Sequence, residues 1–330
     1  MRYAPLVYLA KDERYGPTSA SRFIRNSELR WSHDEGGSDH KKAGRGEVDE
    51  TELGDGGYSD QVTYPGGVFP HGRHIRSNQN VRPNDGGGDG GDEGFFLDLD
   101  NSKRGALGEG TNAPVYFEAA GGRYITYWLF YAYNEGPFNG VAGVGSDIDN
   151  HEGDWERISV HLDRGNRAVG VAYYQHDGYK ELSWDKVPKH GGSHPIVYSA
   201  RGSHASYAAP GAKKIETSIV GHDVHTADDR ASKGAAWQTW KHLTNVRHQK
   251  WYGYGGAWGE VGNPIVDKFT HDETTGPQGP SHKQPAPECA TTNSTSSLPW
   301  VSASISCSRD DATCTRAPSL HSSTRSASAW

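Results

Sequence analysis

Cysteine is missing from most of this 330-residue chain, and methionine occurs only at position 1. All three cysteines, Cys289, Cys307 and Cys314, lie near the C-terminus. Residues 1–288 therefore contain neither a disulfide nor a thiolate metal site. The cysteines do not indicate whether the protein resides in an oxidising or a reducing compartment.

Long hydrophobic runs and an excess of basic charge are also missing. The longest apolar run, YITYWLFYAY (124–133), is far shorter than the roughly 20 residues of a membrane-spanning helix. The formal net charge is −7, and no basic patch or stripe of the kind that binds nucleic acid occurs. The start, MRYAPLVYLAKDER, lacks a cleavage site after small residues, which predicts no signal peptide. We expect a cytoplasmic protein by default, with a vacuolar or secreted location as the alternatives.

Glycine, tryptophan and tyrosine are abundant, with 43, 10 and 17 copies. Short apolar runs alternate with turn residues, which predicts a mainly β protein, an antiparallel β-sandwich with a few short helices and long glycine-rich loops. The predicted strands are YAPLVYL, APVYFEA, YITYWLFYAY, WERISVHL, AVGVAYYQH and HPIVYSA. Helices are predicted over 18–29 and 234–246. The aromatic residues of WYGYGGAWGEVG (251–262) are expected to pack in the core rather than to stack on a ligand.

The composition changes near residue 284. Residues 1–283 are predicted to form one β-sandwich domain, and 284–330 a disordered tail rich in Ser and Thr with one glycosylation sequon, Asn293-Ser294-Thr295. The stretch NDGGGDGGDEG (84–94) is similar to calcium-binding glycine-aspartate repeats, but it occurs once and such folds need several copies. It is predicted to be a mobile loop.

The segment NHEGDWERISVHLD (150–163) combines acidic residues with a strand pattern. Alternation in a strand places five side chains on one face: Asp154, Glu156, Ile158, Val160 and Leu162. Two carboxylates this close repel by roughly 4 kcal/mol at an effective dielectric constant of 20. A bound cation, a protonated carboxyl group or an arginine such as Arg157 or Arg201 could offset this repulsion.

His151 precedes these carboxylates, and Gly153 lets the chain bend so that imidazole and carboxylates converge. Such ligands favour a divalent cation, Mg²⁺, Ca²⁺ or Mn²⁺ before Zn²⁺. The alternative is a solvated strand end whose charges never meet. Three more histidines at the ends of apolar runs, His176, His194 and His204, predict one polar mouth at the edge of the sandwich.

Two family resemblances follow from these blocks. YAPLVYLAKDERYGPTSASRFIRNSEL, YWLFYAYNEG, HEGDWERISVHLD, HPIVYSARGSHASY, WYGYGGAWGEVG and TGPQGPS resemble, in this order, the family related to vacuolar protein sorting protein 62, over about residues 2–283. The order YWLFYAYN, HEGDWE, QHDGY, and HPIVY with SHASY also looks like the core of the necrosis- and ethylene-inducing-peptide-like proteins. The second resemblance implies a β-sandwich that uses a divalent cation to engage sphingolipid sugar headgroups.

The second resemblance also implies a ligand set. His151, Asp154 and Glu156 fall on the cation-binding positions of the His-x-His-Asp-Trp-Glu motif, and Asn134 stands where that family has an aspartate. Gly153 replaces the middle histidine, and Asp147 or Asp149 would have to supply the carboxylate that Asn134 lacks.

Three functional hypotheses result, and binding is preferred to catalysis. The first is a divalent-cation-dependent protein that binds a sugar or lipid headgroup, with the membrane surface as one setting. Its predicted metal ligands are His151, Asp154, Glu156, Asn134 and Asp147, and its predicted ligand-contacting residues are His176, His194, His204, Arg201 and Trp155, with Trp155 packing behind the cation.

The second hypothesis is a hydrolase of glycosidic or ester bonds. Glu156 and Asp154 would act as an acid and base pair, or His204 or Glu152 would be the base for a metal-activated water. A serine hydrolase elbow and a His-Glu-x-x-His motif are both missing. The third hypothesis, an intracellular protein-sorting factor, rests on the name of the first family.

Overall fold

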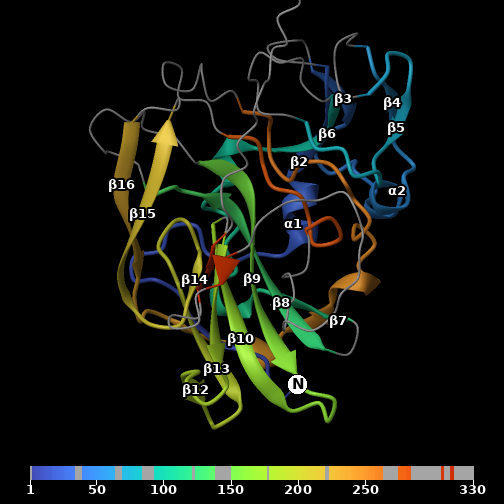
Figure 1. Cartoon of the computed structure of the whole chain (residues 1–330). Coiled ribbons are helices and arrows are strands. Elements are labelled where there is room, and N and C mark those ends of the chain that lie inside the picture. Colours follow the sequence, from blue (N-terminus) through green and yellow to red (C-terminus); the bar gives the residue numbers. More distant parts are fainter. Residues whose placement is uncertain are drawn as a thin grey trace, which may run out of the picture.

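Strands dominate the computed structural model, and its helices are short, as predicted (Figure 1). It describes residues 2–33, 39–63, 69–83, 93–120, 123–137, 150–176, 178–219, 223–262 and 274–283, with 306–307 and 313–315. Among the predicted site residues, Asp147 lies outside the described residues, as do 84–92 of the glycine-rich stretch and most of the tail. None of the described helices has the length and hydrophobicity that a membrane crossing requires.

The large sheet has eight strands, and its centre is a meander from β7 to β11. The strand order is β18 (Leu243–Asn245), β7 (Val115–Ala120), β8 (Tyr124–Asn134), β9 (His151–Leu162), β10 (Ala168–Gln175), β11 (Gly178–Ser183), β20 (Thr313–Thr315) and β19 (Ser306–Cys307). All neighbours are antiparallel except β18 and β7. The long strands β8 and β9 lie at its middle and carry the predicted site.

A second sheet covers one face of the large sheet. Its order is β12 (Lys189–His190), β13 (His194–Ser199), β1 (Leu6–Tyr8) and β17 (Ala236–Gln238), and β14 (Ser206–Tyr207) also pairs with β13. Between the sheets, Val7, Val197 and Trp237 pack against residues such as Tyr127 and Ile158. This is the sandwich that the sequence predicts, although β1 and β13 run parallel.

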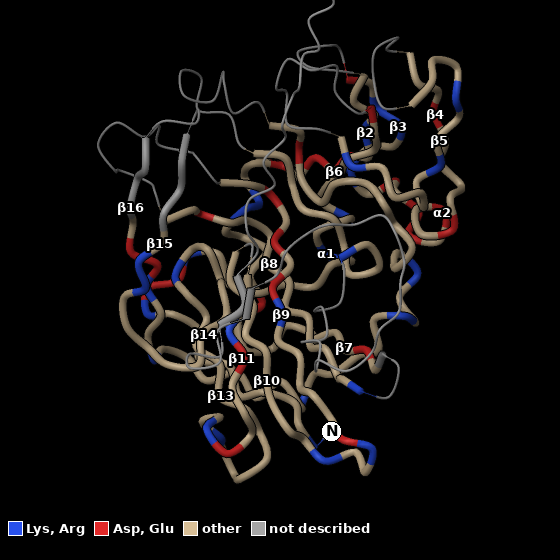
Figure 2. The backbone as a smooth tube through the Cα atoms, in the orientation of Figure 1, with Lys and Arg blue, Asp and Glu red and all other residues tan. Residues whose placement is uncertain are grey.

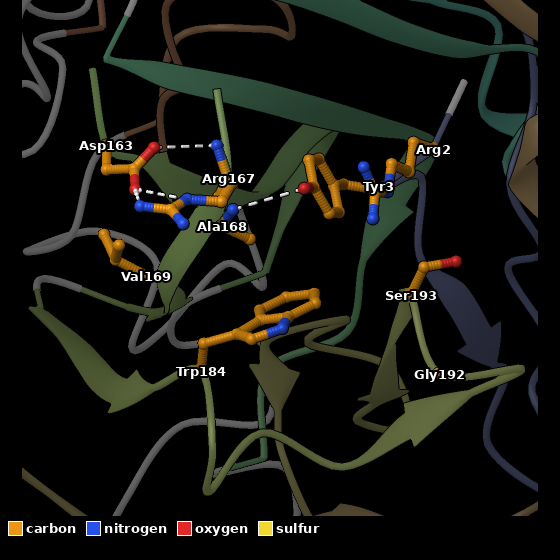
Figure 3. A pocket seen from close by; sticks show the side chains of 9 residues that line it. All are labelled: Arg2, Tyr3, Asp163, Arg167, Ala168, Val169, Trp184, Gly192 and Ser193. Carbon is orange, nitrogen blue, oxygen red and sulfur yellow. Dashed lines mark hydrogen bonds and ion pairs between the residues drawn. The ribbon is translucent and has the colours of Figure 1, made fainter. Parts of the chain in front are cut away.

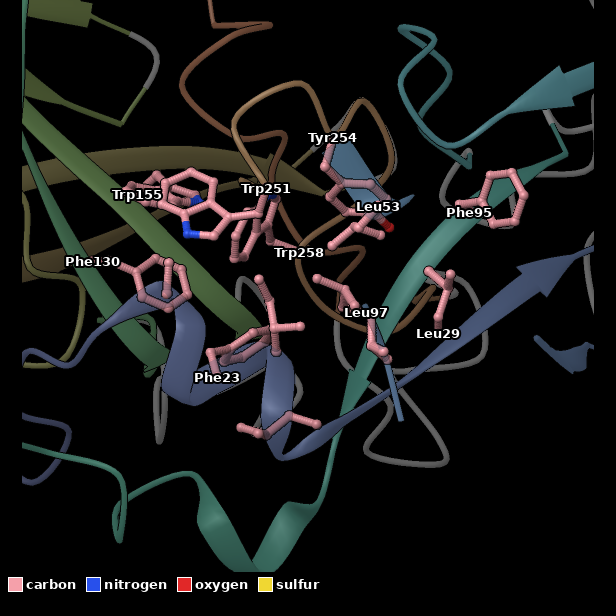
Figure 4. Close-up of a cluster of buried hydrophobic side chains, with 14 of the residues drawn as sticks. Phe23, Leu29, Leu53, Phe95, Leu97, Phe130, Trp155, Trp251, Tyr254 and Trp258 are labelled. Carbon is pink, nitrogen blue, oxygen red and sulfur yellow. The ribbon is translucent and has the colours of Figure 1, made fainter. Parts of the chain in front are cut away.

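The other face of the large sheet packs against an aromatic core (Figure 4). This face is covered by α1 (Ala20–Arg25), by the sheet of β3 (His40–Ala43), β2 (Ser27–Ser32) and β6 (Gly94–Leu99), and by Trp251, Tyr254 and Trp258. Strand β8 is thus buried on both faces, which explains its continuous apolar sequence. The expected packing of the 251–262 aromatics is confirmed.

The remaining elements belong to neither of the two sheets of the sandwich. They are α2 (Glu50–Asp55), β4 (Ser59–Gln61), β5 (His74–Arg76), the hairpin of β15 (Gly211–Ile219) and β16 (Asp223–Ala231), and the 3₁₀ turns η1 (Asn101–Lys103), η2 (Gly110–Asn112), η3 (Thr239–Lys241) and η4 (Val246–His248). Helix α2 was not predicted, although Asp49 caps it by accepting from the N–H groups of Thr51 and Glu52.

The six predicted strands are confirmed, and the two predicted helices differ in outcome. Helix α1 forms within 18–29 and is capped by Ser19, but the chain leaves it at Asn26 and continues as β2. The helix predicted over 234–246 is wrong, because this segment forms β17, η3 and β18. Trp237 pairs with Val7 of β1 and is fully buried between the sheets, and this tertiary pairing overrides the helical spacing.

Gly153 sets the local geometry of β9. Its φ is +58°, a left-handed conformation that glycine adopts without strain. A Cβ built at this position would lie 2.1 Å from the carbonyl oxygen of Trp258. The middle histidine of the toxin-like motif could therefore not stand here.

Gly153→Ala is expected to lower the free energy of unfolding by about 2–4 kcal/mol, from backbone strain and the clash with Trp258. Urea unfolding measures the effect. Gly105→Ala is the control, since its Cβ would meet its nearest neighbour, the Arg14 carbonyl oxygen, at an ordinary 3.5 Å. Equal stabilities of the two variants would contradict the prediction.

Candidate functional site

A group of charged side chains, the ionic cluster, lies where β9 meets the second sheet. Its members are Glu13, Asp154, Glu156, His204 and Lys283. They come from the N-terminal segment, from β9, from the turn between β13 and β14, and from the end of 274–283. Acidic positions on β9 are visible within the fold in Figure 2. The cluster therefore joins segments that are remote in sequence.

His204 is the centre of the ionic cluster and is fully buried. Its Nδ1 lies 2.8 Å from Oδ2 of Asp154, and its Nε2 lies 3.5 Å from Oε1 of Glu13. The ring stacks on Tyr131 with 3.7 Å between ring centroids and an interplanar angle of 5°. These contacts fix the imidazole between two carboxylates and one aromatic face.

Both partners of the pair between His204 and Glu13 are held in their charged forms. Burial disfavours the imidazolium, but Glu13 and Asp154 outweigh it and raise the pKa of His204 to about 10. Burial likewise opposes the Glu13 carboxylate, but His204 and the N–H groups of Gly202 and Tyr15 lower its pKa to about 2. Those two N–H groups donate at 2.8 and 2.9 Å.

Glu156 and Lys283 complete the ionic cluster, and both are partly buried. Burial and the neighbouring charge of Asp154 raise the pKa of Glu156, while Lys283, His176 and His204 act in the opposite direction. Within the described residues, no hydrogen bond reaches the Glu156 carboxylate. The ammonium of Lys283 donates to the carbonyl oxygen of Trp155 at 2.7 Å.

A second set of polar side chains, centred on Asp229 of β16, adjoins the cluster. The fully buried Asp229 carboxylate accepts from Ser203 at 2.6 Å and from Tyr207 at 2.7 Å, and Nε2 of His176 lies 3.3 Å away. Burial and Asp229 raise the pKa of Tyr207. The charges of Glu156 and His176 act on each other, which links the two sets.

Strained backbone surrounds the ionic cluster. Four residues other than glycine have positive φ in the described chain, and three of them lie in or beside the cluster: His204 itself at +55°, Asp12 at +61° and His176 at +46°. Such conformations cost of order 1–3 kcal/mol each and concentrate at functional sites. Burial of charge and strain thus coincide at one place.

The structure separates the predicted ligand-contacting residues. His176 and His204 belong to the polar region just described, and Arg201 is exposed on the turn beside it. His194 donates from Nδ1 to the Ala4 carbonyl oxygen at 2.7 Å and packs on Trp240, away from the cluster contacts. Trp155 is 1 % exposed and packs into the aromatic core behind β9 (Figure 4).

The predicted metal ligands are also only partly brought together. His151 pairs with the buried Asn134 in the strand register, and its Nδ1 donates to the Gly153 carbonyl oxygen at 2.9 Å. Glu152, offered as a general base, instead accepts from the Leu99 N–H at 2.8 Å and contacts Arg104.

The described residues do not fit a divalent cation as they stand. Asp154 is engaged by His204, and the ammonium of Lys283 lies at the backbone between Asp154 and Glu156. In the part of the chain that the structure describes, no three His, Cys, Asp or Glu side chains are grouped to hold a metal ion. A ligand set that includes Asp147 stays a prediction.

Sequence reasoning did not find Glu13, Asp229 or Lys283. Glu13 lies in a block that carries the family resemblance but no chemical motif, and Asp229 and Lys283 lie outside the quoted blocks. Each reaches the site only through tertiary packing. The spacing of Asp154 and Glu156 was informative because both project from one strand toward the same neighbours.

A separate pocket of about 460 Å³ lies beside the turn between β9 and β10 (Figure 3). It is lined by Arg2, Tyr3, Asp163, Arg167, Ala168, Val169, Trp184, Gly192 and Ser193. Arg167 is paired with Asp163 at 2.8 Å, so its charge is already balanced. None of the predicted site residues lines this pocket.

The fold and the cluster define a β-sandwich protein with a buried ionic site at the meeting of its two sheets. Residues 67–261, more than half of the chain, match the family described as vacuolar protein sorting-associated protein 62. The chain belongs to this family, which confirms the first resemblance.

Two individual proteins are similar to the chain. The putative vacuolar protein sorting-associated protein TDA6 of Saccharomyces cerevisiae is 24 % identical over 245 residues, which cover 64 % of this chain and 46 % of TDA6. The chain thus matches less than half the length of that relative. The crystal structure of Necrosis and Ethylene inducing Protein 2, from the causal agent of cocoa's Witches Broom disease, is 14 % identical with a TM-score of 0.25, covering 81 % of this chain and 96 % of that one.

His204 should make stability depend on pH. Its pKa is 6.5 in the unfolded chain and about 10 in the fold, so its contribution is complete below pH 6.5 and is lost as pH rises toward 10. The free energy of unfolding should fall by about 1 kcal/mol per pH unit in this window. Urea titrations at several pH values measure it. His204→Gln should lack this slope, and an equal slope in both proteins would contradict the assignment.

Proposed function

We propose that this chain is a binding protein that acts in vacuolar protein sorting and takes a sugar or lipid headgroup at the ionic cluster. The names of its family and of TDA6 support the sorting role. The observation that carries the binding site is the burial of opposed charges on strained backbone. His204, which pairs with Asp154 and Glu13, is itself left-handed, as are Asp12 and His176 nearby. Such an arrangement destabilises the fold locally, and groups of this kind are typical of sites that act on a ligand.

The chemistry of the cluster suits a ligand rich in hydroxyl groups. Glu156 offers carboxylate oxygens that accept no hydrogen bond within the described residues, and it is partly exposed. Lys283 and His176 supply donors beside it. Sugar rings and inositol or glycerol headgroups present hydroxyls that donate to carboxylates and accept from ammonium groups.

A hydrolase is the second candidate, because Asp154 and Glu156 project from one strand and His204 orients Asp154. Catalysis would need substrate between the two carboxylates, and binding would not. The two functions differ in one readout, since only the hydrolase releases product from the bound ligand.

Glu156→Gln is expected to weaken binding to immobilised glycans and lipid headgroups about tenfold or more, because an amide replaces the carboxyl group that faces the ligand hydroxyls. The binding of the full chain to glycan and lipid-headgroup arrays measures this loss, and mass spectrometry of the incubated ligands detects any product. If Glu156→Gln binds as tightly as the wild type and releases no product, the ionic cluster is not the binding site.

Two matched substitutions control this experiment. Glu181→Gln changes a carboxylate of the same sheet that pairs with His161, outside the cluster. Asp228→Asn changes the exposed neighbour of Asp229 on β16. Both should bind as the wild type does. Loss of binding in either control to the same extent as in Glu156→Gln would show that the effect is not local.

A further inference from the structure

Lys283 places a cationic group where the toxin-like resemblance puts a divalent ion. Its Nζ donates to the carbonyl oxygen of Trp155 at 2.7 Å, and Trp155 stands between Asp154 and Glu156 in β9. The charges of both carboxylates act on this ammonium. The lysine ammonium therefore lies beside the backbone of the strand segment that carries both carboxylates.

The segment that carries Lys283 is anchored to the fold. Thr274 donates to the Asn150 carbonyl oxygen from its N–H at 2.8 Å and from its hydroxyl at 2.9 Å. The Trp258 N–H donates to the Pro277 carbonyl oxygen at 2.8 Å, and the Lys283 N–H bonds back to the Gly279 carbonyl oxygen at 3.2 Å. These hydrogen bonds hold the backbone that carries Lys283 in place, and this backbone positions the ammonium against β9.

A divalent ion and the Lys283 ammonium exclude each other at this place. Both are positive, both are attracted by Asp154 and Glu156, and their mutual repulsion is strong where little water screens it. His204 has already engaged one oxygen of Asp154 at 2.8 Å, which removes a metal-binding position. The cluster therefore offsets part of its acidic charge with two cationic groups of the chain itself, His204 and Lys283.

We propose that Lys283 is a built-in cation that stands in for a divalent ion beside Asp154 and Glu156, so that the acidic charge of β9 is offset without a metal. This proposal concerns the ion and not the ligand. Its failure would leave the headgroup-binding proposal standing, and a negative result from the headgroup arrays would leave the proposal about Lys283 standing. On this proposal, the positive charge beside Asp154 and Glu156 comes from a side chain and not from a bound metal ion.

The proposal is tested by titrating the full chain with Mn²⁺. Binding is measured from the electron paramagnetic resonance signal of the free ion. Lys283→Met should bind Mn²⁺ at least about tenfold more tightly than the wild type, because it frees the carboxylates. Lys283→Arg should match the wild type, since it keeps the charge. Adding Glu156→Gln to Lys283→Met should abolish the gain, and the exposed Lys250→Met should show none.

Two results would overturn the proposal. One is a wild type that binds Mn²⁺ as tightly as Lys283→Met. The other is a wild type whose unfolding temperature rises with Mn²⁺ and falls with a chelator, while Glu156→Gln shows neither change. The second measurement needs no lysine variant, so it decides the matter even where Lys283→Met does not fold.

Discussion

The placement of His204 between Asp154 and Glu13 is the interaction on which the site depends. It connects the turn after β13, the middle of β9 and the N-terminal segment in one contact set. Removing one member of such a buried set leaves an uncompensated charge, which costs about 3–5 kcal/mol. The cluster therefore fixes how the second sheet sits on the large one, while the aromatic packing on either side of β8 supplies most of the buried area.

Much of the fold could be predicted because local sequence patterns determine its strands. The six strand segments carry their own alternation or apolar runs, and the continuous apolar sequence of β8 reflects its burial on both faces. The segment 234–246 could not be predicted in this way. Trp237 and Trp240 have a helical spacing, yet Trp237 is drawn into the β1 edge by a partner 230 residues away, Val7.

The candidate site, like the fold, could be predicted only where local sequence patterns determine it. Asp154 and Glu156 were found from the sequence by their alternation along β9, and His176 and His204 by their places at the ends of apolar runs. Glu13 and Lys283 were not, because each is an ordinary charged residue until the fold brings it to β9. Trp155 packs into the aromatic core. His194 was grouped with the other histidines only through its similar position at the end of an apolar run, and it contacts Ala4 and Trp240 instead.

Strand β9 couples the two faces of the molecule. Trp155 packs against Trp251 and Trp258 in the aromatic core, while its carbonyl oxygen holds Lys283 and its neighbours Asp154 and Glu156 carry the cluster charges. Gly153 allows the backbone of Trp258 to approach this strand closely. A shift of the 251–283 segment would therefore move the lysine relative to the carboxylates. The aromatic core thus sets the charge geometry of the site, although none of its rings belongs to the ionic cluster.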